Sequence, residues 1–163
     1  MLKKLLMIWF ISYQIAFAAC TQTGSTFTAA STSQTDVQAC VTAASSFGTS
    51  PIPTIAIPTG TSTWTGGITF CYSVIIQGNG TTNTVITRSG TAPFLQVTNP
   101  CNNVILRFTA MGLDDTSGLN TSNAMISPFD CYGCRVRVDH NAFVGPTSNT
   151  DRAVWFGGNI IGL

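Results

Sequence analysis

The stretches CNNVILRFTAMGL (101–113) and CYGCRVRVDHNAF (131–143) align with each other when the chain is shifted by thirty positions. A fixed period of this length is typical of repeat proteins, in which each unit buries its apolar face only when a neighbour stacks on it. The same shift predicts four columns of equivalent positions: Cys71, Cys101 and Cys131; Val74, Val104 and Cys134; Ile76, Leu106 and Val136; and the segments 93–96, 123–126 and 153–156.

The repeated element is a short strand. In VILRF (104–108) and CRVRV (134–138), inward apolar or cysteine positions alternate with outward arginines, namely Arg107, Arg135 and Arg137. Such strands, recurring once per coil and separated by turns with Gly and Asn, predict an all-β parallel solenoid whose coils stack about 4.8 Å apart. We expect about three coils, beginning at Cys71, Cys101 and Cys131.

The composition supports this fold and narrows the possible partners. The chain has 163 residues, which is the usual size of one domain. After residue 4 it has no Lys and no Glu, and its five Arg and six Asp leave a net charge near −1. Loss of the best charged helix formers favours β-structure, and the lack of a basic patch argues against a nucleic-acid partner.

The first nineteen residues read as an export signal, with Lys3 and Lys4 ahead of an apolar run and a small-residue pattern at 16–18. We therefore expect a secreted or cell-surface protein. Ala18-Ala19-Cys20 also resembles the end of a bacterial lipoprotein signal, so a membrane attachment is expected only if Cys20 is lipidated.

Six cysteines in an exported chain predict disulfides, and six allow 15 pairings. We expect Cys20 to pair with Cys40 and to clasp the entry segment to the cap. Cys71, Cys101 and Cys131 lie one coil apart, close enough for bridges between coils.

Residues 20–34 are predicted to be an extended entry segment, and 35–163 a capping helix followed by the coils. The helix is expected over 36–44, with Thr35 and Gln38 as a capping box and Val37, Val41 and Ala44 on its apolar side. It would cover the open end of the first coil. Gly78 and Gly80 are expected at a sharp corner with positive φ.

By the same period, a fourth coil would begin near Ile161, two residues before the end of the sequence. Natural solenoids end in polar caps, whereas the last residues (156–163) are apolar and Gly-rich. We therefore expect further coils beyond Leu163 or, as the alternative, a partner subunit stacked on the open end.

Three segments carry a family likeness. The sequence of residues 36–70, from DVQACV to GGITF, resembles the N-terminal region of pectate-lyase-like right-handed parallel β-helix proteins. VIIQGNGTTNTVI (74–86) is similar to their first coil, and RVRVDHNAF (135–143) to their "V-W-I-D-H" strand. The resemblance implies a right-handed β-helix whose complete form binds or cleaves an extracellular polysaccharide. The superfamily also holds adhesins and tailspike fibres, so a non-enzymatic scaffold is the alternative.

The resemblance also implies that calcium could bind the complete protein. Here, however, Arg137 replaces the Trp of the strand motif, and Asn123 lies near the position expected for a first Asp ligand. Asp130 is the only carboxylate just upstream of the strand, which makes a poor calcium site. The catalytic coils of the family would lie beyond Leu163, so we expect no turnover from these 163 residues alone.

Two acidic pairs are weak catalytic candidates. Asp114 and Asp115 are adjacent on one loop, which is more typical of a solvated turn than of two carboxylates facing each other across a sugar. Asp139 and His140 are the only place where a carboxylate and the sole His meet. The alternation predicts that His140 points inward at a coil corner, as a hydrogen-bonded residue rather than a general base.

The remaining candidates are cysteines and arginines. Cys131 and Cys134 have metal-ligand spacing, but no second pair completes a zinc site, so we expect all six cysteines to be structural and no metal. Cys134 points into the core by alternation and could stay free. The outward Arg107, Arg135 and Arg137 could bind the carboxylates of an acidic glycan. Their alternative role is solubility.

Overall fold

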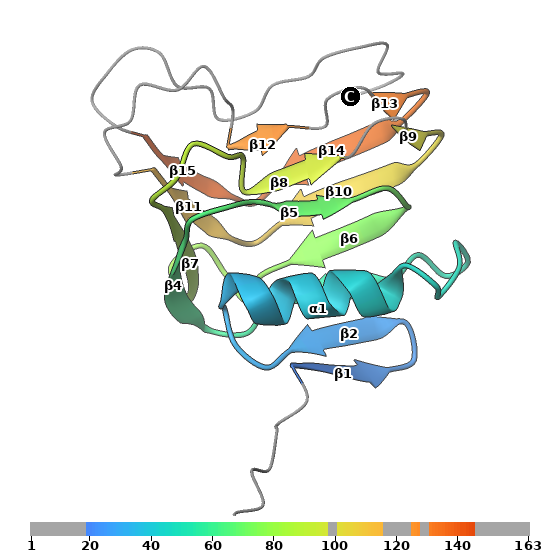
Figure 1. Cartoon of the computed structure of the whole chain (residues 1–163), viewed down its shortest axis with the longest axis horizontal. Helices are drawn as coiled ribbons and strands as arrows, with labels where there is room; N and C mark the ends of the chain where they lie inside the picture. The colour runs from blue at the N-terminus through green and yellow to red at the C-terminus, as the bar shows by residue number, and fades with distance from the viewer. Residues whose placement is uncertain (1–18, 98–100, 116–124, 128–130, 146–163) are drawn as a thin grey trace, which may run out of the picture.

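The computed structural model of the chain describes residues 19–97, 101–115, 125–127 and 131–145. These residues form a β-solenoid of about four turns, with a single helix across its first coils (Figure 1). The predicted fold class is confirmed. The sequence predicted about three coils. The structure has more because the strand ahead of the first predicted coil adds a further layer to the stack.

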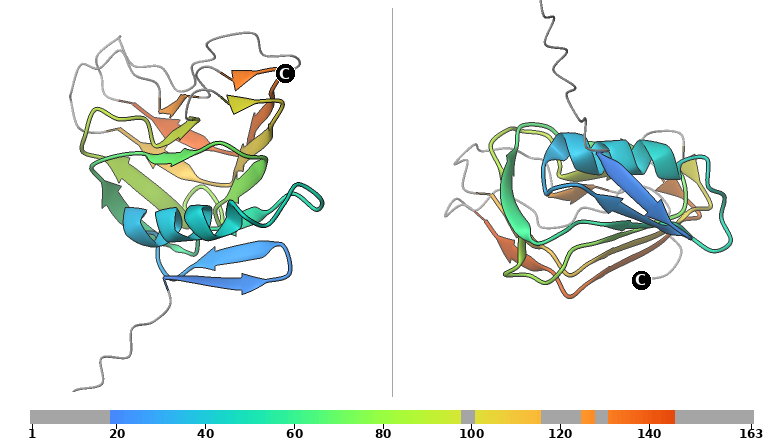
Figure 2. Two further views of the ribbon diagram at one scale, coloured as in Figure 1. Left: turned by 45° about the vertical axis from the view of Figure 1, so that its right-hand side comes forward. Right: turned by 90° about the horizontal axis from the view of Figure 1, so that it is seen from below.

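The strands stack into four sheets, and all their pairings are parallel except that of β1 with β2. Sheet A consists of β1 (Cys20–Thr23), β2 (Thr26–Ala29), β3 (Thr54–Ala56), β6 (Val74–Gln77), β10 (Ile105–Thr109) and β14 (Arg135–Asp139). Sheet B consists of β4 (Gly60–Trp64), β7 (Thr84–Arg88), β11 (Gly112–Asp114) and β15 (Ala142–Val144). Sheet C consists of β5 (Ile68–Phe70), β8 (Leu95–Val97) and β12 (Ile126–Ser127), and sheet D of β9 (Cys101–Asn102) and β13 (Cys131–Tyr132). Figure 2, seen from below, shows the coils enclosing a common interior.

The thirty-residue register holds between the second and third coils only. Leu106 lies opposite Val136, as predicted. In the preceding coil, however, Val74 lies opposite Leu106, so its predicted alignment with Val104 is wrong by two residues. A shift of two residues keeps the same side chains facing inward, which is why the alternation still identifies the core.

The predicted alignment in sheet C is also wrong, by one residue. Ile126 lies opposite Leu95, whereas the repeat paired Leu95 with Met125. The third member of that column, 153–156, lies outside the described residues.

Apolar side chains from successive strands fill the interior. Phe27, Ile55, Ile76 and Phe108 occupy one inward column of sheet A, and all are buried. Trp64, the last residue of β4 in sheet B, is also buried. Its indole N–H donates to the Thr32 carbonyl oxygen at 2.9 Å. Each coil therefore buries its apolar face against the next, as the repeat predicted.

Helix α1 (Gln34–Ala44) covers the start of the solenoid and contacts β1, β2, β3, β4 and β5. Its N-cap is Ser33, whose side chain accepts a hydrogen bond from the backbone N–H of Asp36 at 3.2 Å. Serine with an acid three residues later is a favourable helix start. The capping box predicted at Thr35 is therefore wrong, and the helix begins two residues before the predicted start.

The other helix predictions are confirmed. Val37, Val41 and Ala44 are buried on the side that faces the coils. Gln38 serves a different purpose from capping, because its amide exchanges two hydrogen bonds with the backbone of Thr69. This contact ties α1 to the coil at β5.

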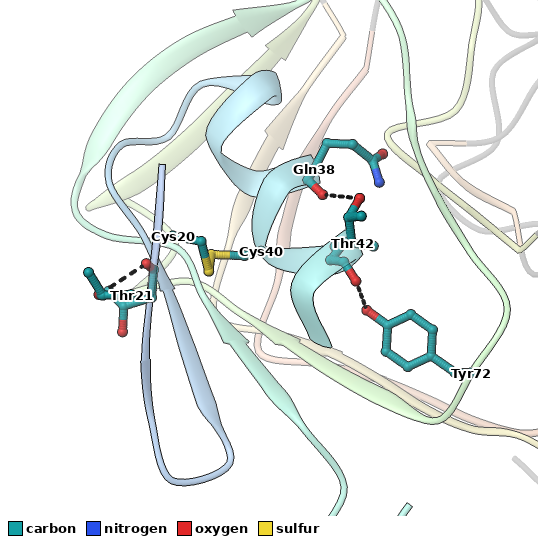
Figure 3. The surroundings of a disulfide bond; sticks show 8 residues. Cys20, Thr21, Gln38, Cys40, Thr42 and Tyr72 are labelled. Carbon is teal, nitrogen blue, oxygen red and sulfur yellow. Dashed lines mark hydrogen bonds between the residues drawn. A yellow bond between two sulfur atoms is a disulfide. The ribbon is translucent and has the colours of Figure 1, made fainter. Parts of the chain in front are cut away.

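The entry segment 20–34 contains the antiparallel hairpin of β1 and β2, which extends sheet A. The disulfide between Cys20 and Cys40 joins this hairpin to α1, with the two Cα atoms 5.0 Å apart, and confirms the predicted clasp (Figure 3). On the other side of α1, the Tyr72 hydroxyl donates to the Val41 carbonyl oxygen at 2.5 Å. Burial raises the pKa of Tyr72 above its ordinary value, so this donor stays protonated.

Sharp corners join sheet A to sheet B. Ala110 and His140 occupy equivalent corners and both adopt positive φ, at 60° and 54°. In the earlier coil, Gly80 has φ 115°, as predicted. The positive φ predicted for Gly78 is wrong, and glycine is required there for a different reason, because a Cβ at this residue would lie 2.3 Å from the carbonyl oxygen of Ala110. The corner therefore needs glycine for space as well as for backbone conformation.

Candidate functional site

Two columns of outward residues run along the solenoid on sheet A, and we name their surface the outer face. Residues aligned in a parallel sheet point to the same side, so the register defines each column. The first column contains Thr26, Thr54, Ile75, Arg107 and Arg137. The second contains Thr28, Ala56, Gln77, Thr109 and Asp139. The outer face is therefore neutral on β2, β3 and β6 and charged on β10 and β14.

Four side chains meet at the charged end, and we name them the arginine cluster: Arg107, Arg137, Asp139 and His140. Arg107 binds Asp139 through two hydrogen bonds, Nε to Oδ1 at 3.1 Å and Nη2 to Oδ2 at 2.9 Å. Arg137, on the same strand as Asp139, approaches the same carboxylate, with Nη2 3.0 Å from Oδ2. His140 Nδ1 lies 3.1 Å from Oδ2. One carboxylate thus organises three cationic or polar side chains.

The electrostatics of the cluster follow from this geometry. The hydrogen bond from Arg107, helped by His140 and by the charge of Arg137, holds the pKa of Asp139 well below its ordinary value although burial opposes the shift. The same hydrogen bond raises the pKa of Arg107. Asp139 is therefore ionised at neutral pH. Arg107 and Arg137 share this one carboxylate, and Arg135 is exposed on the same strand as Arg137, so this part of the solenoid surface is positive.

Arg137 is the part of the cluster most available to a ligand. Its side chain is 65% exposed, whereas that of Asp139 is 14% exposed. All three arginines singled out in the sequence lie on the predicted outward side.

The inward orientation predicted for His140 is wrong. Its side chain is 76% exposed and hydrogen-bonds Asp139 from the solvent side. The reason is its positive φ, since a residue in the left-handed conformation at the corner ends the two-residue alternation of the strand. The structure therefore brings Asp139 and His140 together, but on the surface.

A calcium ion does not fit at Asp139. Both carboxylate oxygens already accept hydrogen bonds from cationic guanidinium groups, which would repel a divalent ion. The other positions considered from the resemblance, Asn123 and Asp130, lie outside the described residues. Within the described residues, no group of three His, Cys, Asp or Glu side chains could hold a metal ion.

The solvated turn predicted at Asp114 and Asp115 is wrong for Asp115. This residue is fully buried and forms an ion pair with Arg88, which is buried too. Arg88 was not among the predicted site residues. Its signal was present in TVITR (84–88), where the inward alternation of Thr84 and Ile86 places Arg88 inside.

The cysteines have structural positions. A disulfide joins Cys71 to Cys101 across one coil, with the Cα atoms 5.4 Å apart, as the column predicted. Cys134 is buried, as its position in the strand predicted, and it is disulfide-bonded rather than free. The side chain of Cys131 lies outside the described residues. Disulfides of this kind are typical of proteins outside the reducing cytosol.

No protein family, curated protein or solved structure matches the chain. In the part of the chain that the structure describes, no helix is long and apolar enough to cross a membrane.

Proposed function

We propose that this protein binds an acidic extracellular polysaccharide on the outer face of sheet A, with the arginine cluster contacting the carboxylates of uronate sugars. The observation that carries the proposal is the exposed guanidinium of Arg137, fixed by Asp139 beside Arg107. Arginine matches a carboxylate through two parallel N–H donors, which makes it the preferred partner for this group.

Asp139 favours binding by holding the cluster in place before the ligand arrives. Arg137 has one Nη atom on Asp139, while its other donors make no hydrogen bond to any described residue. A long side chain that is already ordered loses less conformational entropy on binding. Arg135, exposed on the same strand, would add charge for the initial encounter.

Membership of the pectate-lyase-like superfamily is part of this proposal. It is supported by the sequence likeness over 36–70, 74–86 and 135–143 together with the stacked parallel coils under a helix. An extracellular location is supported by the disulfides and the export-signal pattern of the first nineteen residues. Cleavage of the bound glycan is the activity that the likeness to this superfamily adds to the proposal.

A non-enzymatic scaffold, adhesin or fibre protein is the second candidate. The observation that favours it is covalent reinforcement, since one disulfide joins the hairpin to α1 and another joins successive coils. Such links stabilise an elongated structure without contributing to a site. The two candidates differ in whether the outer face binds a glycan.

The test is isothermal titration calorimetry of the full chain with polygalacturonate and, as a neutral polymer, dextran. We expect binding of polygalacturonate only, weakening with salt. Loss of a charged hydrogen bond costs about 1.5–3 kcal/mol, so Arg137→Gln should reduce affinity about tenfold or more. Arg137→Lys is the matched control, because it keeps the charge and loses the two-donor geometry; its affinity should fall between the two.

Circular dichroism would confirm that each variant folds, as expected for substitutions at an exposed side chain. Equal affinity of wild type and the double variant Arg107→Gln, Arg137→Gln would overturn the proposed site. Absence of binding to any acidic polymer would favour the scaffold.

A further inference from the structure

We infer that the neutral end of the outer face holds a second subsite, which takes an uncharged sugar ring of the same polysaccharide. This inference rests on the proposed function and narrows its ligand to an acidic heteropolysaccharide. Its basis is a hollow of about 410 Å³ over β2, β3 and β6. Small-ligand pockets usually measure about 300–1,000 Å³, so the hollow is large enough for a sugar ring.

Hydroxyl and amide side chains line the hollow. The hydroxyls of Thr26, Thr28 and Thr54 and the amide of Gln77 line it and make no hydrogen bond to any other described residue. Asn79 is held at the rim, with its Nδ2 donating to Thr59 Oγ1 at 2.8 Å. Hydroxyl and amide groups can each donate and accept, which matches the hydroxyls of a sugar.

The charge of the lining selects a neutral ring. None of the residues that line the hollow is ionisable. A uronate carboxylate placed there would lose water without gaining a counter-charge, whereas a neutral hydroxyl exchanges one hydrogen bond for another. The acidic sugars are therefore assigned to the arginine cluster and the neutral sugar to the hollow.

The register sets the spacing between the two subsites. Thr54 lies opposite Ile75, and Ile75 lies opposite Arg107, so two strand spacings separate Thr54, on the middle strand of the hollow, from Arg107 in the cluster. Two steps of about 4.8 Å give about 9.6 Å along the solenoid. A glycan laid across the strands would pass over the half-buried Ile75 between the subsites, where an apolar side chain can contact sugar C–H groups.

The hollow is built on fixed elements. Thr26 and Thr54 stand on adjacent strands of sheet A, and Pro58 at the rim is held by a hydrogen bond from Thr84 Oγ1 to its carbonyl oxygen at 2.9 Å. A subsite that is already formed requires little ordering when the ligand binds.

The experiment compares two polymers by calorimetry on the full chain. Hyaluronate alternates a uronate with an N-acetylated neutral sugar, and polygalacturonate contains uronate only. The test variant combines Thr26→Val and Thr54→Val, which removes two hydroxyls while keeping the shape of the side chains. Valine is also favourable in a β-strand, so the variant should fold. The matched control is Thr61→Val, an exposed threonine on β4 outside the outer face.

We expect the double variant to bind hyaluronate about fivefold to tenfold more weakly and polygalacturonate unchanged, with Thr61→Val equal to wild type for both. Equal binding of hyaluronate by wild type and double variant would overturn the subsite while leaving the proposed function standing. Equal weakening for both polymers would overturn the assignment to a neutral sugar. If wild type binds neither polymer, the proposed function fails and the subsite with it.

Discussion

The buried ion pair of Arg88 and Asp115 should be the most sensitive electrostatic contact in the described structure. Their side chains are 1% and 0% exposed, so both charges lie inside the solenoid. Removing one partner of a buried pair costs about 3–5 kcal/mol, because the remaining charge stays buried and loses its ion-pair partner. We therefore expect Asp115→Leu and Arg88→Met each to destabilise the fold by about 4 kcal/mol.

The assay is urea unfolding of the four proteins that make up the double-mutant cycle, followed by far-ultraviolet circular dichroism. With a slope near 2 kcal/mol per molar urea, a loss of about 4 kcal/mol lowers the midpoint by about 2 M. The double variant should regain most of this loss, because apolar residues of similar volume often replace a buried pair at little cost. The coupling energy between the sites should therefore be large.

Two results would refute this reasoning. Single variants that cost less than about 1 kcal/mol would show that water or other groups compensate each charge, as at an exposed pair. A double variant whose loss equals the sum of the single losses would show that the two residues act independently.

The structure makes two further predictions. Because the pKa of Asp139 is lowered in the fold, its pair with Arg107 stabilises the protein fully above about pH 4 and is lost as the pH falls through the folded pKa. The difference in urea midpoint between wild type and Asp139→Asn should therefore shrink between pH 5 and pH 2, and a constant difference would contradict the assignment. Gly78→Ala should lower stability by about 1–3 kcal/mol, since its Cβ would meet the Ala110 carbonyl. Thermal melts of the two variants measure this, and Gly145→Ala, whose Cβ meets nothing within 4 Å, should be near neutral.

The fold was accessible from the sequence because two independent patterns agree. The thirty-residue period indicates stacked units, and the alternation in VILRF (104–108) and CRVRV (134–138) indicates strands with one buried side. The cysteine column added a geometric check, since only stacked coils bring Cys71 near Cys101.

The register of the first coil could not be read from the same period. Six residues join β6 to β7 at the corner, whereas two join β10 to β11. The offset between these coils is consequently 32 residues in sheet A and 27 in sheet B, and a shift of thirty matches neither. A single period averages over corners of unequal length, and sequence alone does not show where the extra residues lie.

The site was only partly predictable, because the backbone conformation, and not the charge of a residue, determines whether its side chain points inward or outward. Arg107 and Arg137 follow strand alternation and were placed correctly. His140 was not, since the turn conformation at the corner reverses its direction. Asp115 was assigned to solvent as a charged loop residue, although its partner Arg88 stands at an inward position one coil earlier.

The distribution of charge on sheet A argues that its outer face is more than a solubilising surface. Arginines that serve only solubility are best hydrated when each is exposed separately to water. Pairing them with a surface carboxylate adds little to stability. Here Arg107 and Arg137 converge on one carboxylate that is mostly buried, while β2, β3 and β6 present hydroxyls and an amide that make no hydrogen bond to another described residue. Ordering long side chains around Asp139 costs conformational entropy, which offsets part of what the ion pairs contribute to stability. A ligand that uses both ends of the face would recover that cost, and the two calorimetric experiments measure whether one does.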